Sequence, residues 1–278
     1  MATATLEIVL RRDRIVVAAA LVGLAALAWG YVLWLAADMD MGDMDMGGMD
    51  MNDFRIIPAG IGIMAQALSP WSGVEFAFVF AMWAVMMVGM MTPSASPMIL
   101  IYARLGRQAA VADKPFAATA WFVAGYLLAW IGFALFATVA QWALDRAALL
   151  DSTMTSASSV LGGGVLIAAG IYQWTRLKDL CLAKCQSPFL FIQQLGGFRR
   201  DATGATLLGL RHGAYCVGCC WVLMALLFVG GVMNVLWIAL LALLVLLEKL
   251  LWFGRWIARA AGVAFVAAGA WLLFTGMA

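Results

Sequence analysis

Long apolar runs without charged residues recur along this chain, and they constrain its fold more than any other feature. Each run is about 18 residues or longer, which lets a helix cross about 30 Å of hydrocarbon. Strands that cross membranes alternate polar and apolar residues, and these runs do not alternate. Charged residues make up only 12% of the chain, so a water-soluble fold could not cover its apolar surface. The sequence therefore predicts an all-α fold, a polytopic bundle of transmembrane helices.

Prolines, glycines and charged residues divide the runs into about seven predicted spans. The first covers residues 15–37 and is longer than the apolar part of a signal peptide, so we expect it to be retained. The other spans are predicted at residues 73–91, 115–144, 160–174, 213–253 (two spans) and 260–277. Residues 54–70 contain two prolines and two glycines, and we expect them to lie at the interface or to re-enter the membrane. The chain thus divides into 1–37 (stub and first helix), 38–53 (a periplasmic loop) and 54–278 (the helix bundle).

Basic residues are distributed unevenly between the segments that join these spans. With seven spans and a cytoplasmic N-terminus, every Lys and Arg except Arg55 and Arg146 falls on the cytoplasmic side. Cytoplasmic segments carry this excess of basic residues in most membrane proteins. The same cytoplasmic basic residues account for the net charge of +2, which gives no indication of nucleic-acid binding. We predict a multi-pass protein of a bacterial inner membrane, surrounded by the lipid bilayer.

Residues 38–53 form a low-complexity segment, DMDMGDMDMGGMDMND, with six Met and six Asp. On the oxidising outer side, thioethers remain available where thiols would form disulfides. Thioethers are soft ligands that select Cu(I), and the carboxylates raise the local concentration of cations. The predicted ligands are Met39, Met41, Met44, Met46, Met49 and Met51. The alternative is a flexible acidic linker.

Methionines also recur inside the second predicted span, at a helical spacing. Met82, Met86 and Met90 lie four residues apart, so each step rises about 6 Å along one face of a helix. These residues are predicted to form a path that passes a cation between thioethers. Ordinary packing explains the same pattern, because Met fills gaps in apolar cores.

The five cysteines form two groups on the predicted cytoplasmic side. Cys181 and Cys185 lie in the loop after the fourth span, and the second group begins the fifth span, four residues after His212. That second group is Cys216, Cys219 and Cys220. On a helix, His212 and the second group share one face of about 100°. Thiols stay reduced in the cytoplasm, so these residues are predicted metal ligands, although free Cys can also act as a small buried hydrophobe.

Few other groups in the chain carry chemistry. A single His excludes a paired-imidazole haem and a three-histidine zinc site. Glu248 lies inside the sixth span, where a carboxylate is a predicted functional group and metal ligand. The alternative is that Glu248 pairs with its neighbour Lys249. No catalytic set is recognised, which favours a role other than catalysis.

Four stretches of this sequence resemble one bacterial family. They are MWAVMMVGMMTPSASPM, GIYQWTRLKDLCLAKCQSP, GAYCVGCCWVLM and the later Glu-Lys pair. Together they resemble a family of integral membrane proteins that is described as predicted metal-binding. This family is called the domain of unknown function 2182. The resemblance covers residues 73–277 and implies metal binding by the five cysteines, without an established activity. The Met/Asp segment lies outside it.

These features favour a protein that handles Cu(I), although another soft metal would also suit the thiols. Weak thioether sites outside, a path through the second span and tight thiolate sites inside would support import or inward delivery. Two other functions remain open. One is a membrane thiol redox protein that passes electrons between the cysteine groups. The other is an accessory subunit that loads a membrane copper enzyme, or that exchanges copper with a copper chaperone.

The topology can be tested with reporter fusions. A reporter fused after Ala278 is expected to be periplasmic and one fused at Gln186 cytoplasmic, because this arrangement keeps the basic segments inside. Paired alkaline phosphatase and fluorescent-protein fusions measure both positions. A cytoplasmic reporter at Ala278 would contradict the seven-span topology.

Overall fold

The computed structural model describes residues 2–42, 71–108, 115–150, 154–156, 158–197, 199 and 201–276. Apart from an isolated bridge between Leu150 and Ser156, the regular elements in these ranges are helices. The longer ones are α1 (Ala2–Gly42), α3 (Gly73–Gln108), α4 (Pro115–Arg146), α8 (Ala202–Ala225) and α11 (Gly254–Gly276). The shorter ones are α5 (Ser159–Tyr172), α6 (Arg176–Gln186), α7 (Pro188–Gln194), α9 (Leu227–Gly230) and α10 (Val235–Leu250). The predicted all-α fold is confirmed.

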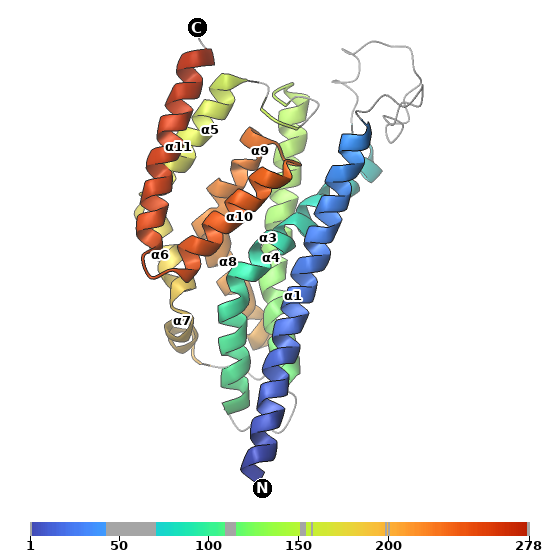
Figure 1. The fold of residues 1–278 in the computed structure, drawn as a ribbon, viewed down its shortest axis with the longest axis vertical. Helices are drawn as coiled ribbons and strands as arrows, with labels where there is room; N and C mark the ends of the chain where they lie inside the picture. The colour runs from blue at the N-terminus through green and yellow to red at the C-terminus, as the bar shows by residue number, and fades with distance from the viewer. Residues whose placement is uncertain are drawn as a thin grey trace.

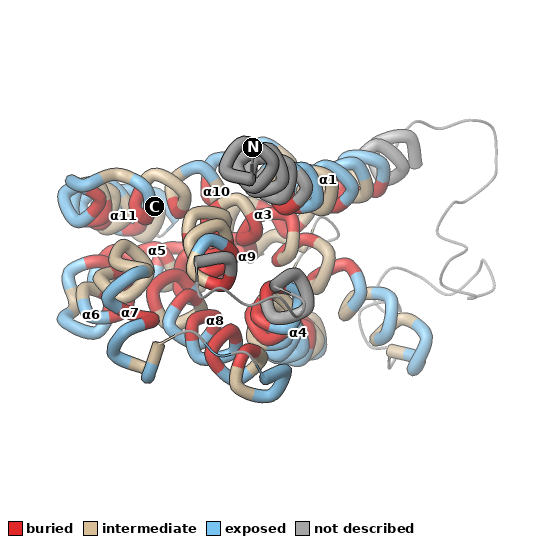
Figure 2. The backbone as a smooth tube through the Cα atoms, turned by 90° about the horizontal axis from the view of Figure 1, so that it is seen from below, coloured by how far each residue is buried: buried red, intermediate tan, exposed pale blue. Residues whose placement is uncertain are grey.

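The helices form a bundle elongated along one axis, with the two chain ends at opposite ends of that axis (Figure 1). Helix α1 packs along α3 on one side, and α5 pairs with α11 on the other. Between them, α4 packs against α8, and α10 contacts α3, α6, α8 and α11. Buried residues face the interior between α3, α4, α8 and α10, while the outer faces of the helices are exposed (Figure 2). In a bundle this apolar, those exposed faces suit contact with lipid.

Five of the described helical segments are long and apolar enough to cross a membrane. They are Val17–Ala36, Gly73–Gly106, Thr119–Arg146, Ala202–Gly230 and Gly254–Gly276. The predicted fourth and sixth spans correspond to α5 and α10, which have 14 and 16 residues. Helices of that length fall short of the ~20 residues that a crossing needs. The count of seven spans therefore stays a prediction.

Helix α3 continues past the predicted end of the second span at Met91. It runs through Pro93 and Pro97 to Gln108. Each proline removes one backbone N–H, which leaves a carbonyl of the preceding turn without its usual donor. The hydroxyl of Ser96 donates to the carbonyl oxygen of Pro93 at 2.7 Å, which is the acceptor that Pro97 frees. Side-chain donors of this kind allow a helix to continue through proline in an apolar setting.

Two other predicted boundaries differ in the structure. The fifth span begins at Ala202 and not near residue 213, because the Asp201 side chain caps the helix by accepting from the Gly204 amide. Residues 176–186, predicted as a loop, form helix α6, which Thr175 caps in the same way. Residues 38–42 of the predicted Met/Asp loop are helical, as the last residues of α1. Residues 43–53 and the predicted interfacial segment 54–70 lie outside the described residues.

Glycines allow α4 and α8 to approach backbone to backbone. A Cβ atom at Gly209 of α8 would overlap the carbonyl oxygen of Phe122 in α4, and one at Gly125 would overlap that of Thr206. Small residues at such contacts are typical of helix packing in membranes, where close approach supplies the van der Waals attraction. This contact sets the position of the second cysteine group, because that group lies farther along α8.

A Gly209→Ala substitution tests this close contact. We expect it to lower the free energy of unfolding by about 1–3 kcal/mol, because one backbone must move away from the other. Thermal unfolding of the detergent-solubilised protein measures the change. Gly132→Ala is the matched control, since a Cβ there meets nothing within 4 Å and also lies in a helix. Equal melting temperatures for the two variants would contradict the proposed contact.

Candidate metal site

The two cysteine groups, 31 residues apart at their nearest, meet between α6 and α8. The Cys185 side chain interacts with those of Cys216 and Cys219. Cys181 lies one helical turn earlier on α6, and its Sγ faces Gly218, 3.0 Å from where a Cβ would stand. All five cysteines are free thiols. The structure therefore brings together all the cysteines that the sequence singled out.

Local sequence explains this convergence. The spacing of four residues puts Cys181 and Cys185 on one face of α6, the face that packs on α8. Gly218 has no side chain, so the sulfur of Cys181 can approach the backbone of α8. Burial raises the pKa of the Cys181 thiol. Hydrogen bonds to Cys216 and Cys219, together with burial, raise the pKa of Cys185.

Lys249 of α10 points into the cysteine cluster. Its Nζ lies 2.8 Å from Cys216 Sγ and 4.0 Å from Cys220 Sγ. It also donates to Ser94 Oγ of α3 at 3.3 Å. The residue is 7% exposed. The sequence offered Glu248 as the partner of Lys249, and this was wrong, because the ammonium group turns toward sulfur.

Further contacts surround Cys216. The Tyr126 hydroxyl of α4 lies 3.2 Å from Cys216 Sγ and donates to the Met91 carbonyl oxygen, also at 3.2 Å. The thiols of Cys219 and Cys220 donate to the Cys216 carbonyl oxygen at 3.1 and 2.9 Å. Groups from α4, α6, α8 and α10 thus meet at this one residue, and α3 is linked to it through Tyr126 and Lys249.

Glu248 is held by partners other than its neighbour. Its carboxylate accepts from Lys178 Nζ at 2.6 Å and from Gln173 Nε2 at 3.1 Å. Lys178 is fully buried, and Glu248 is 1% exposed. The Gln186 side chain donates to the Glu248 backbone carbonyl at 2.7 Å. This pair ties α10 to α6, and it satisfies a carboxylate that would otherwise be a buried, unpaired charge.

His212 lies one turn before Cys216 on α8 and is 3% exposed. Its ring packs among those of Phe122, Tyr126 and Phe191. Among the described residues its Nδ1 has no hydrogen-bond partner. A buried imidazole nitrogen without a partner is costly in a structural role and suits a ligand position better.

The described part of the chain holds no group of three or more Cys, His, Asp or Glu side chains with the geometry of a metal site. Cu(I) needs only two soft sulfur ligands, and the described cluster offers several close together. The donor set therefore suits a soft cation such as Cu(I).

The predicted methionine path lies in the interior of the bundle. Met82, Met86 and Met90 are all buried on α3, and the next residue in that row is Ser94, which contacts Lys249. Met87 and Met91 are buried beside them. The row therefore ends next to the cysteine cluster. Of the outer methionines, Met44, Met46, Met49 and Met51 lie outside the described residues, and Met39 and Met41 lie in the last turns of α1.

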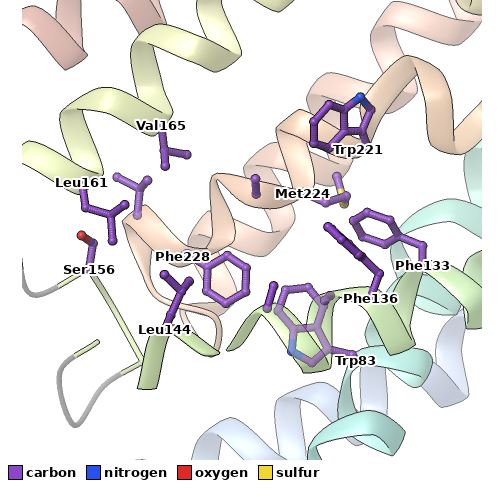
Figure 3. A pocket seen from close by; sticks show the side chains of 14 residues that line it. Trp83, Phe133, Phe136, Leu144, Ser156, Leu161, Val165, Trp221, Met224 and Phe228 are labelled. Carbon is purple, nitrogen blue, oxygen red and sulfur yellow. The ribbon is translucent and has the colours of Figure 1, made fainter. Parts of the chain in front are cut away.

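One sulfur near the site was missed by the sequence analysis. Met224 follows Cys220 by four residues, so His212, Cys216, Cys220 and Met224 form one row on α8. Met224 borders an apolar cavity of about 210 Å³ between α4, α5 and α8 (Figure 3). Trp83, Phe136 and Trp221 also line this cavity. The spacing of four residues that identified the cysteine face would have identified Met224 too.

The fold and site define a class of protein: a bundle of apolar helices, several of membrane-spanning length, with a buried thiol cluster. A family model described as PpoB2, copper chaperone, matches residues 80–272. The chain belongs to this family, and its function is copper-related. The family name inferred from the sequence, domain of unknown function 2182, stays a prediction. Neither a curated protein nor a solved structure matches the chain.

The buried Lys178–Glu248 pair can be tested by comparing single and double replacements. Lys178→Met alone is expected to lower the free energy of unfolding by about 3–5 kcal/mol, because it leaves a buried carboxylate unpaired. Adding Glu248→Leu should recover most of the loss, since no buried charge then remains. Chemical or thermal unfolding in detergent measures both.

Asp179→Asn provides the matched control. Asp179 forms the partly exposed pair with Arg259 at 3.8 Å, so its replacement should change stability by less than about 1 kcal/mol. A double variant that is less stable than the single variant would contradict this account of the buried pair.

Proposed function

We propose that the protein binds Cu(I) at the cluster of Cys185, Cys216, Cys219 and Cys220, and carries it inward across a bacterial inner membrane. The observation that supports this most is the convergence of thiols from α6 and α8 around one point. Membership of a copper chaperone family supports the choice of metal. Cys181 borders the cluster, and His212 lies beside it with an unpartnered nitrogen.

Methionines would supply the outer part of the route. The segment 38–53 would collect copper on the periplasmic side, and Met82, Met86 and Met90 would pass it along α3. Thioethers are neutral at every pH, so a cation can move between them without proton release. Thiolates bind Cu(I) more tightly, which gives the route a direction. In this scheme Glu248 holds α10 in place, whereas the sequence suggested it as a ligand.

Delivery needs a recipient, and the chemistry indicates a second copper-binding protein. A membrane copper enzyme, loaded by this chain as an accessory subunit, or a cytoplasmic copper chaperone would fit. A thiol redox role is the competing function, since the same sulfurs are close enough to interact.

The joint replacement Cys216→Ser and Cys219→Ser tests the copper site. We expect bound Cu(I) to fall below one-tenth of the wild-type content, because both sulfurs at the centre of the cluster are lost. Cys220→Ser alone should lose less, since other thiols can replace one ligand. Metal analysis of anaerobically purified protein measures the content.

The redox alternative is tested on the same variants by alkylation-shift gels of rapidly quenched cells. The copper proposal expects reduced thiols, since a disulfide cannot hold the metal. A resting disulfide between α6 and α8, in protein without bound copper, would contradict the proposal and favour redox chemistry.

A further inference from the structure

Lys249 is a buried cation with no carboxylate partner among the described residues. The described ion pairs are Lys178 with Glu248, and Asp179 with Arg259. The nearest groups to Lys249 Nζ are instead Cys216 Sγ, Ser94 Oγ and Cys220 Sγ, at 2.8, 3.3 and 4.0 Å. A buried charge is costly unless an opposite charge lies near it. The only groups in this set that can become anionic are the two thiols.

The neighbouring acid does not change this balance. Glu248 and Lys178 neutralise each other on the adjacent side of α10, at 2.6 Å. His212 packs among the rings of Phe122 and Phe191 and forms no described ion pair. Lys249 therefore contributes one positive charge that the surrounding protein leaves for the sulfurs.

We propose that Lys249 is the residue that makes the cysteine site selective for a monovalent metal ion. Two thiolates carry two negative charges, Cu(I) carries one positive charge, and the Lys249 ammonium supplies the other. The loaded site is then neutral. This inference rests on the proposed Cu(I) site.

A divalent ion cannot reach the same balance with two thiolates. Zn(II) in place of Cu(I) would leave one excess positive charge in a buried site. A third thiolate would restore neutrality for zinc, so the discrimination by Lys249 applies to coordination by two thiolates. Lys249 would thus disfavour zinc and favour Cu(I). This selectivity by charge adds to the selectivity for Cu(I) that soft sulfur ligands already provide.

The experiment measures Cu(I) and Zn(II) affinities of the full-length protein in detergent, by anaerobic competition with chromophoric chelators. Lys249→Gln removes the charge, and Lys249→Arg keeps it. We expect Lys249→Gln to weaken Cu(I) binding by at least about tenfold while Zn(II) binding is unchanged or tighter. Lys249→Arg should keep the wild-type order of preference.

A second pair of variants leaves Lys249 in place. Ser94→Asp puts a carboxylate beside the ammonium and cancels its charge, and Ser94→Asn is the neutral control of similar size. Ser94→Asp should weaken Cu(I) binding relative to Ser94→Asn. If Lys249→Gln does not fold, this second pair tests whether the Lys249 charge supports Cu(I) binding. Equal Cu(I) affinities within both pairs, or equal losses of Cu(I) and Zn(II), would overturn the inference. Wild-type protein that binds no Cu(I) would instead refute the proposed function itself.

Discussion

The contact between Lys249 and Cys216 depends on the position of nearly every other helix in the bundle. An ammonium group 2.8 Å from a buried sulfur requires α10 to lie against both α3 and α8. The ion pair of Lys178 and Glu248 fixes α10 on α6, and the glycine contacts of Gly125 and Gly209 fix α8 on α4. If the contact of Lys178 with Glu248 or that of Lys249 with Cys216 were lost, a charged side chain would remain in an apolar interior without compensation. The same contacts that stabilise the bundle therefore assemble the site.

The general fold followed from the sequence because it depends on composition and on the length of apolar runs. The boundaries did not follow as well, since they depend on local compensation. The hydroxyl of Ser96 lets α3 continue through Pro97, and Asp201 starts α8 well before the apolar run begins. Both effects come from single polar side chains, and an average over hydrophobicity does not register them.

Predictions about the site divided in a similar way. The helical spacing placed His212, Cys216 and Cys220 on one face because that periodicity is local. The partner of Lys249 could not be found locally, because Cys216 lies 33 residues away on another helix. The adjacent Glu248 was the obvious partner in sequence, but consecutive residues on a helix point about 100° apart. In the structure the two side chains accordingly point to different neighbours, Lys178 and Cys216.

The order of ligand types along the proposed route has a physical explanation. Thioethers carry no charge, so Met82, Met86 and Met90 can line an apolar helix without a counter-ion. Thiolates bind more tightly, but each one buries a negative charge that must be compensated. Lys249 is a buried cation without a described carboxylate partner, and the row of methionines ends beside it at Ser94. In the proposed scheme the tight site therefore forms at this end of the row, and the position of one lysine would help to set the direction of copper transfer.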